Sequence, residues 1–317
     1  MQTLAAENLS PDRFCFWQPS AAATVAVGPE RQPFILPDYP LPVHRDDMVD
    51  GTPSDAAIGQ GTYDYLRQFP DCAGNRIYAE LLRDAYPHFL SDLASLAVMI
   101  DAKQVDPAFV ARKLNCLKIL LLLEPDNQGL LGQLCRGYFD LALDYAELPR
   151  CRRHLLDAMR FGQDLLKLAP HDMLALSVLA EIDWLFGDTP AAVAKWRTLS
   201  AQIGDAATAA RIDRRIEVCN GEIRLDAALV DDLELLAEAV HLHAIGDNPR
   251  ALRLLERLEG EGFLMKALPS AEFFWLLGTC RRECGDPSGA AVAWNKALEI
   301  EPEHTASLAA LASAPGV

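Results

Sequence analysis

The sequence AEFFWLLGTCRRECGDPSGAAVAWNKALEIEPEH, from Ala271 to His304, carries the clearest signs of the fold. Two runs with apolar residues at helical spacing flank a break at Gly285-Asp286-Pro287. Glycine readily takes the left-handed conformation that ends a helix, and aspartate followed by proline is suited to begin the next one. Pro302 lies just beyond the second run. The stretch therefore predicts two helices joined by a tight turn.

Small residues stand where these two helices are expected to touch, and bulky residues surround them. The small ones are Gly278, Ala290 and Ala297, and the bulky ones are Phe274, Leu277 and Trp294. This arrangement resembles a tetratricopeptide repeat (TPR), a helix–turn–helix unit of about 34 residues. One departure is Arg281, which occupies the place where the repeat usually has a tyrosine-like residue.

The same pattern recurs along the chain, with further TPR-like units around residues 173–206 and 232–265. Second helices are expected to begin near Pro107, Pro149, Pro190, Pro249 and Pro287. We count about five helical pairs, two of them degenerate, after an N-terminal helix that starts at Asn75. An extra helix is expected over Ala206–Arg224 and a short capping helix over Thr305–Ala312. Stacked pairs share a core and wind into a superhelix, so the predicted fold is an all-α, TPR-like α-solenoid.

Two segments differ in composition. Residues 1–74 are rich in proline and glycine, which argues against a helical period there and indicates an extended arm. Short strands are expected at Thr24–Val27 and Phe34–Leu36. Aromatic residues in this arm favour docking on its own helices or on a second copy over a poorly ordered tail. Residues 75–317 form the predicted repeat domain.

Composition narrows the range of partners and locations. The formal net charge of −16 disfavours nucleic acid and anionic membranes, and it suits solubility and a basic partner. No apolar run approaches the roughly 20 residues of a membrane span. The eight cysteines include no C-x-x-C pair and favour the reducing cytoplasm.

The sequence holds few signs of catalytic chemistry. Phosphate-binding loops, dinucleotide fingerprints, zinc-protease motifs and nucleophile elbows are all absent. His241 and His243 point to different faces of a helix, and Cys280 with Cys284 has no evident third ligand. We therefore expect no enzyme activity, no cofactor and no metal. The basic clusters Arg152–His154 and Arg211–Arg215 are read as solvated faces or as contacts to an acidic segment.

The TPR resemblance implies that the first helix of each pair lines a concave inner face where a partner binds. The candidate partner-binding residues on that face are Glu181, Trp184, Leu236, Val240, His243, Trp275, Thr279 and Arg282. Leu174 and Ser177 belong to the same face. The positions that match the carboxylate-binding residues of TPR chaperone adaptors hold Ser177, Val178, Leu236, Ala237, Trp275 and Leu276, so no carboxylate clamp is expected. Trp184 or Trp275 could instead be covered by the extra helix or by the arm.

The expected function is that of a protein–protein interaction scaffold or adaptor. An apolar or amphipathic segment of a partner would be buried in the groove, with acidic residues at the rim selecting it. One alternative is a homo-oligomer that assembles through the N-terminal arm or the terminal repeat. A second alternative is the regulatory subunit of an enzyme complex.

Overall fold

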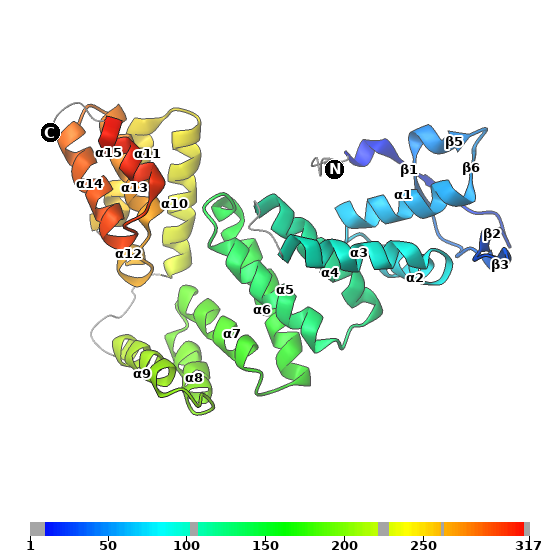
Figure 1. Cartoon of the computed structure of the whole chain (residues 1–317), viewed down its shortest axis with the longest axis horizontal. Coiled ribbons are helices and arrows are strands. Elements are labelled where there is room, and N and C mark those ends of the chain that lie inside the picture. The colour runs from blue at the N-terminus through cyan, green and yellow to red at the C-terminus, as the bar shows by residue number, and fades with distance from the viewer. Residues whose placement is uncertain (1–9, 102–106, 221–227, 261–262, 314–317) are drawn as a thin grey trace. The chain divides into compact units, whose positions relative to one another are not determined.

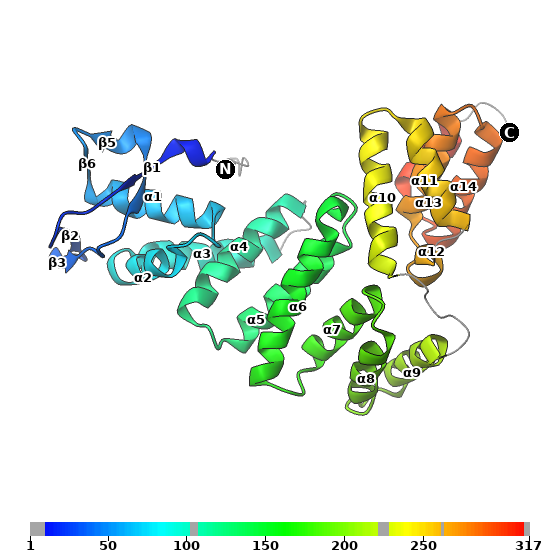
Figure 2. The same ribbon diagram turned by 180° about the vertical axis from the view of Figure 1, so that it is seen from behind.

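Helices make up most of this chain. A computed structural model describes residues 10–101, 107–220, 228–260 and 263–313, and fifteen α-helices follow a small set of strands within them (Figures 1 and 2). The predicted all-α class is thus confirmed at the level of a mostly helical chain. The chain forms two compact units, residues 1–137 and 138–317, and the division falls within α5 (Gln128–Ala142).

The N-terminal unit begins with three antiparallel strand pairs. The first joins β1 (Phe14–Trp17) to β4 (Leu41–His44), the second β2 (Thr24–Val27) to β3 (Gln32–Ile35), and the third β5 (Met48–Val49) to β6 (Thr52–Pro53). The strand predicted at residues 24–27 is confirmed with the same bounds. The one predicted at 34–36 lies at the end of β3 and stops at Ile35.

A helix also lies within the segment expected to be an extended arm. α1 (Asp55–Gln68) begins at Ser54, whose hydroxyl accepts a hydrogen bond from the Ala57 amide at 3.2 Å. The expectation that no helix forms before residue 75 is therefore wrong. No proline lies between Pro53 and Pro70, and the capped run of α1 occupies that interval.

Gly61 allows α1 to approach β4 closely. A Cβ atom at this position would lie 2.6 Å from the carbonyl oxygen of Pro42 and 2.7 Å from the Cα of Val43. Both atoms belong to the backbone of β4, which a side chain could displace only by moving the strand. Gly61 is therefore needed for packing, although glycine inside a helix lowers helix propensity.

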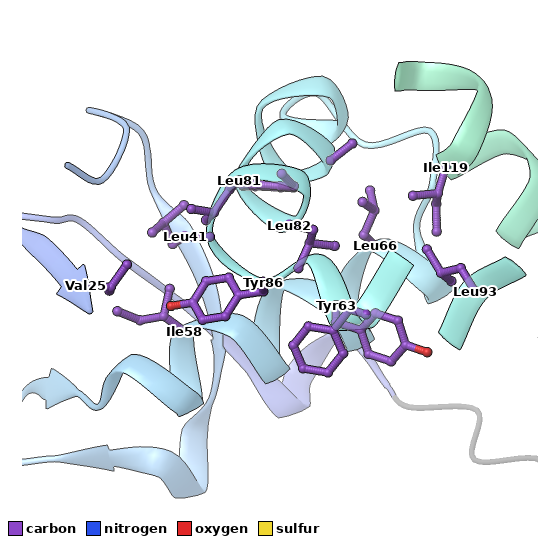
Figure 3. Packing of buried hydrophobic residues seen from close by; sticks show 14 of the residues in the cluster. Val25, Leu41, Ile58, Tyr63, Leu66, Leu81, Leu82, Tyr86, Leu93 and Ile119 are labelled. Atoms are coloured by element: carbon purple, nitrogen blue, oxygen red, sulfur yellow. The ribbon is translucent and has the colours of Figure 1, made fainter. Parts of the chain in front are cut away.

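The core of this unit joins the strand region to four helices. These are α1, α2 (Asn75–Ala85), α3 (Pro87–Asp101) and α4 (Pro107–Leu123). Val25 and Leu41 lie in one buried cluster with Leu82 of α2 and Ile119 of α4 (Figure 3). The hydroxyl of Tyr78 also donates to the Pro40 carbonyl at 2.8 Å. The strand region therefore docks on helices of its own chain, one of the alternatives that the aromatic residues favoured.

The C-terminal unit contains the three pairs that the sequence predicted most clearly. They are α7 (Met173–Leu185) with α8 (Thr189–Ser200), α10 (Leu229–Ala244) with α11 (Asn248–Gly260), and α13 (Ala271–Glu283) with α14 (Pro287–Ile300). The glycine between the helices has a φ of +84° at Gly187, +83° at Gly246 and +88° at Gly285. The following aspartate accepts a backbone amide in each pair, for example Asp286 from Gly289 at 2.8 Å. The predicted turn chemistry is confirmed.

Other helices complete this unit. They are η3 (Leu148–Arg150), α6 (Cys151–Leu168), α9 (Ala206–Asn220), α12 (Leu264–Ala267) and α15 (Thr305–Ser313). α9 and α15 correspond to the predicted extra helix and capping helix. The part of the extra helix predicted over residues 221–224 lies outside the described residues.

The contact between α13 and α14 follows the predicted packing of small against bulky residues. Trp294 is buried, and a Cβ atom at Gly278 would lie 2.5 Å from its Nε1. The same Nε1 donates to the carbonyl oxygen of Trp275 at 3.2 Å. Arg281, which replaces the usual tyrosine-like residue, pairs with Glu259 of α11 at 2.7 Å. At the position where the sequence departs from the repeat pattern, the structure thus has an ion pair between neighbouring helical pairs.

The helices of the C-terminal unit are not stacked in simple chain order. α9 packs on α8, whereas the main contacts of α10 outside its own pair are with η3, α6 and α7. Arg152 of α6 donates to Glu234 of α10 at 2.6 Å and to Asp231 at 2.9 Å. α13 then packs on α11, and α15 packs on α14. The chain thus turns back after α9, and this order differs from one continuous stack.

Candidate partner-binding surface

The candidate residues lie on α7, α10 and α13 as expected, but their exposure differs widely. Leu236 and Thr279 are buried, and the Thr279 hydroxyl donates to the Trp275 carbonyl at 2.9 Å. Both side chains therefore contribute to the packing of the helices. Val240 is half-buried and Arg282 is exposed, so these two positions remain accessible to a partner.

Trp275 is half-buried, because the C-terminal helices pack against it. Its ring belongs to a cluster with Trp294 of α14 and with Ala310 and Leu311 of α15. Arg282 lies beside the same cluster, with its guanidinium carbon 5.4 Å from the centre of the Trp294 ring. Contacts within the chain account for much of the surface of Trp275.

Glu181 and Trp184 lie beneath the extra helix α9. The Glu181 carboxylate pairs with the Arg215 guanidinium, whose carbon lies 4.4 Å from the centre of the Trp184 ring. Trp184 retains 8% of its exposure. Burial raises the pKa of Glu181, although the charge of Arg215 opposes that rise. The alternative that the extra helix covers Trp184 is thus the one observed.

Sequence reasoning missed Trp196 and Arg215 as members of this cluster. Trp196 lies on α8, the second helix of its pair, and its ring centre is 5.0 Å from the Arg215 guanidinium carbon. The sequence pattern places Arg215 only in a basic cluster. Ile216 beside Arg215 indicates a face of α9 that packs against another helix. The sequence does not indicate which helix that face contacts.

An exposed apolar group flanks the turn between α6 and α7. Leu168 ends α6, Met173 and Leu174 begin α7, and all three side chains are exposed. Leu174 was expected on the inner face. Leu168 and Met173 were not singled out, because residues on either side of a turn do not follow a helical period. We call these three residues the α6–α7 apolar group.

Two polar clusters have the composition of catalytic triads but not their accessibility. In the first, His243 Nδ1 lies 2.7 Å from Asn248 Oδ1 and 3.8 Å from Cys280 Sγ. Cys280 has no solvent exposure, and burial raises the pKa of its thiol to about 12. A nucleophilic cysteine needs the thiolate form and access to substrate, so this cluster has the properties of a structural contact.

The second cluster begins α15. His304 Nδ1 lies 2.8 Å from the Ser307 hydroxyl, and its Nε2 lies 3.1 Å from the Glu272 carboxylate. The Ser307 amide also donates to His304 Nδ1 at 3.3 Å, so the histidine acts as a helix cap. Ser307 has no solvent exposure. The cluster attaches α15 to α13 and presents no hydroxyl to a substrate.

The two cysteines of α13 and its C-cap should differ sharply in reactivity. Cys284 is exposed, whereas Cys280 is buried with a raised pKa, one turn away on the helix. We expect a thiol reagent such as an aromatic disulfide to label Cys284 in the folded protein and Cys280 only after denaturation. Peptide mass spectrometry would read both sites, and Cys284→Ser is the control. Equal labelling rates at the two sites would contradict the burial described here.

An open hollow of about 800 Å³ lies in the N-terminal unit, next to the start of α1. Two of its lining residues, Asp55 and Tyr86, are hydrogen-bonded within the unit. The Asp55 carboxylate accepts the Ala26 amide at 3.0 Å, and the Tyr86 hydroxyl donates to the Asp55 carbonyl at 2.8 Å. The hollow therefore lies where a strand and the end of a helix are hydrogen-bonded to the start of α1.

The described part of the chain has neither a cluster of metal ligands nor a membrane-spanning helix. Across residues 10–101, 107–220, 228–260 and 263–313, no three His, Cys, Asp or Glu side chains converge as metal ligands would. Over the same ranges, each helix is too short or too polar to cross a membrane. In comparisons with known proteins, the sequence matches no family model and no curated protein.

Proposed function

We propose that this chain is a TPR-like interaction scaffold that binds an apolar or amphipathic segment of a partner protein. The observation that carries the proposal is the repetition of one turn geometry in three helical pairs. Gly187, Gly246 and Gly285 share a positive φ, and each precedes an aspartate that caps the next helix. Helical repeats of this kind present extended surfaces to other proteins.

The α6–α7 apolar group is an accessible apolar part of the proposed surface. Leu174 has 39% of its surface exposed, and Leu168 and Met173 flank the same turn. Complete burial of a fully exposed side chain of this size contributes about 1.5–3 kcal/mol, and these partly buried side chains would each contribute less than half of that. The net charge of −16 favours a partner segment that also carries basic residues. The buried thiol of Cys280 and hydroxyl of Ser307 are consistent with binding instead of catalysis.

The test uses substitutions on exposed positions, because Trp184 and Trp275 are packed within the chain. Leu174→Asp places a charge in the α6–α7 apolar group. Val292→Asp on α14, where the side chain is 56% exposed on a second helix, is the matched control. Both variants are checked for folding by circular dichroism and thermal melting. Partners are captured from native lysate and then measured with the purified proteins by calorimetry.

We expect Leu174→Asp to weaken partner binding at least about tenfold, because a carboxylate would replace an apolar side chain in contact with the apolar part of the partner segment. Val292→Asp should bind as the wild type does. A partner that tolerates Leu174→Asp and is lost by Val292→Asp would place binding on the second helices. Absence of any captured partner, together with turnover by the isolated protein, would contradict the scaffold proposal.

A homo-oligomer through the terminal repeat is the second candidate, and α15 favours it. This helix contains no charged residue, and Leu308 is 47% exposed on it. Terminal repeats of helical arrays usually carry a polar outer face. Light scattering at several concentrations would show whether the wild type forms oligomers and whether Leu308→Glu prevents their formation. A strict monomer in the wild type removes this candidate.

A further inference from the structure

One arginine holds the extra helix α9 against the α7–α8 pair. The Arg215 guanidinium carbon lies 4.4 Å from the Trp184 ring centre and 5.0 Å from that of Trp196. The same guanidinium pairs with the Glu181 carboxylate. Two indole faces and one carboxylate thus surround a single cation, and we call Glu181, Trp184 and Trp196 the guanidinium slot.

Outside Arg215, α9 packs on α8 mainly through half-buried side chains such as Ala209 and Ile212. Ile216 is the one buried side chain among those of α9 that the structure describes, whereas α7 buries eight side chains. A hydrogen bond between Ser200 and Asp213, at 2.8 Å, adds one polar link. Arg215 Nε is buried and has no hydrogen-bond partner among the described residues. α9 therefore fills the slot imperfectly, with one guanidinium nitrogen unpaired and fewer fully buried side chains than α7.

The chemistry of the slot selects for arginine. A guanidinium is planar and stacks on aromatic faces while its N–H groups reach a carboxylate, and a lysine ammonium does this less well. Glu181 lies in a partly desolvated place, so leaving it unpaired is unfavourable. A guanidinium that leaves the slot takes away the charge partner of Glu181, and a second guanidinium would restore that pair.

We propose that the guanidinium slot is a subsite of the partner-binding surface, and that α9 covers it until an arginine-bearing helix of the partner displaces α9. This inference rests on the proposed scaffold function and names the chemistry of its ligand. The partner segment resembles α9 itself, with an arginine next to an aliphatic residue on one helical face. The negative net charge of the chain attracts such a basic segment.

The test supplies α9 as a separate peptide. The probe copies residues 206–220, contains no tryptophan, and is titrated into the full-length Arg215→Ala protein. Indole fluorescence of the protein and calorimetry report binding. A second peptide carries glutamine at the position of Arg215 and a third carries lysine. Arg211→Ala is the matched protein variant, because Arg211 is exposed on α9 and lies outside the slot.

We expect the arginine peptide to bind Arg215→Ala at least about tenfold more tightly than it binds the wild type or Arg211→Ala. The glutamine peptide should bind at least about tenfold more weakly than the arginine peptide, with lysine in between. In hydrogen exchange, α9 amides should exchange faster in Arg215→Ala while those of α7 do not change. Equal binding of the arginine and glutamine peptides, or unchanged exchange in α9, overturns the proposal.

The peptide test can fail while the scaffold proposal stands, because the peptide test uses no cellular partner. Failure of the peptide with loss of a captured partner in Leu174→Asp would refute only the slot. If a partner is found, its binding segment must lose at least about tenfold in affinity when its arginines become glutamine. A partner segment that tolerates this change also overturns the inference.

Discussion

Replacement of Trp294 by alanine should lower the unfolding free energy of the C-terminal unit by about 3–5 kcal/mol. The side chain is 1% exposed and lies against Gly278, where even a Cβ atom would come within 2.5 Å of Nε1. Its removal leaves a cavity between α13 and α14. The Trp275 carbonyl also loses the indole N–H that donates to it at 3.2 Å.

Urea denaturation followed by far-ultraviolet circular dichroism would measure this effect, with hydrogen exchange assigning it to residues 138–317. Val292→Ala is the control on the same helix, since that side chain is exposed and its loss should change stability by less than about 0.5 kcal/mol. A Trp294→Ala protein that loses less than about 1 kcal/mol would mean that the two helices are not packed through this residue.

Gly61→Ala should destabilise the N-terminal unit by about 1–3 kcal/mol, although alanine is the better helix former. The added Cβ atom would lie 2.6 Å from the Pro42 carbonyl oxygen, a backbone atom of β4. To make room, the strand must move away from α1, and the buried side chain of Leu41 would move with it. Overpacking therefore outweighs the gain of about 1 kcal/mol in helix propensity.

Gly260→Ala is the control, because a Cβ atom there would meet no atom within 4 Å. At that position alanine should be neutral or raise stability by about 0.4–1 kcal/mol. Denaturation curves of the two variants give the signs directly. A stabilising effect of Gly61→Ala would show that β4 does not lie against α1 as described.

Local chemistry made the helical pairs predictable. Gly285, Asp286 and Pro287 each favour a backbone conformation found where one helix ends and the next begins, and neighbours within four residues satisfy it. α1 was not predictable in the same way, because Gly59 and Gly61 lower helix propensity within it. These glycines are needed because they allow α1 to approach Tyr86 and β4 closely. Both partners lie outside α1, so the sequence of the helix does not indicate the contacts.

The sequence predicts which helices carry the candidate residues. It does not predict which of those side chains are exposed. Periodicity places Glu181 and Trp184 on one face of α7, and that placement agrees with the structure. The pattern does not indicate that Arg215, 34 residues later, would cover them. Likewise Leu236 and Val240 share a face of α10, yet one is buried and the other half-buried. Exposure depends on which helix packs next, and the order of packing is not a local property.

The return of α10 to α6 has a consequence for how the C-terminal unit folds. Arg152 meets Glu234 across 82 residues of chain, and Asp231 across 79. A linear repeat array can nucleate anywhere and grow by nearest-neighbour steps, so it tolerates loss of a terminal repeat. Here a long loop must close before α10 gains its contacts with η3 and α6, and that closure costs chain entropy. Folding of this unit is therefore expected to be slower and more cooperative than that of an array of equal length.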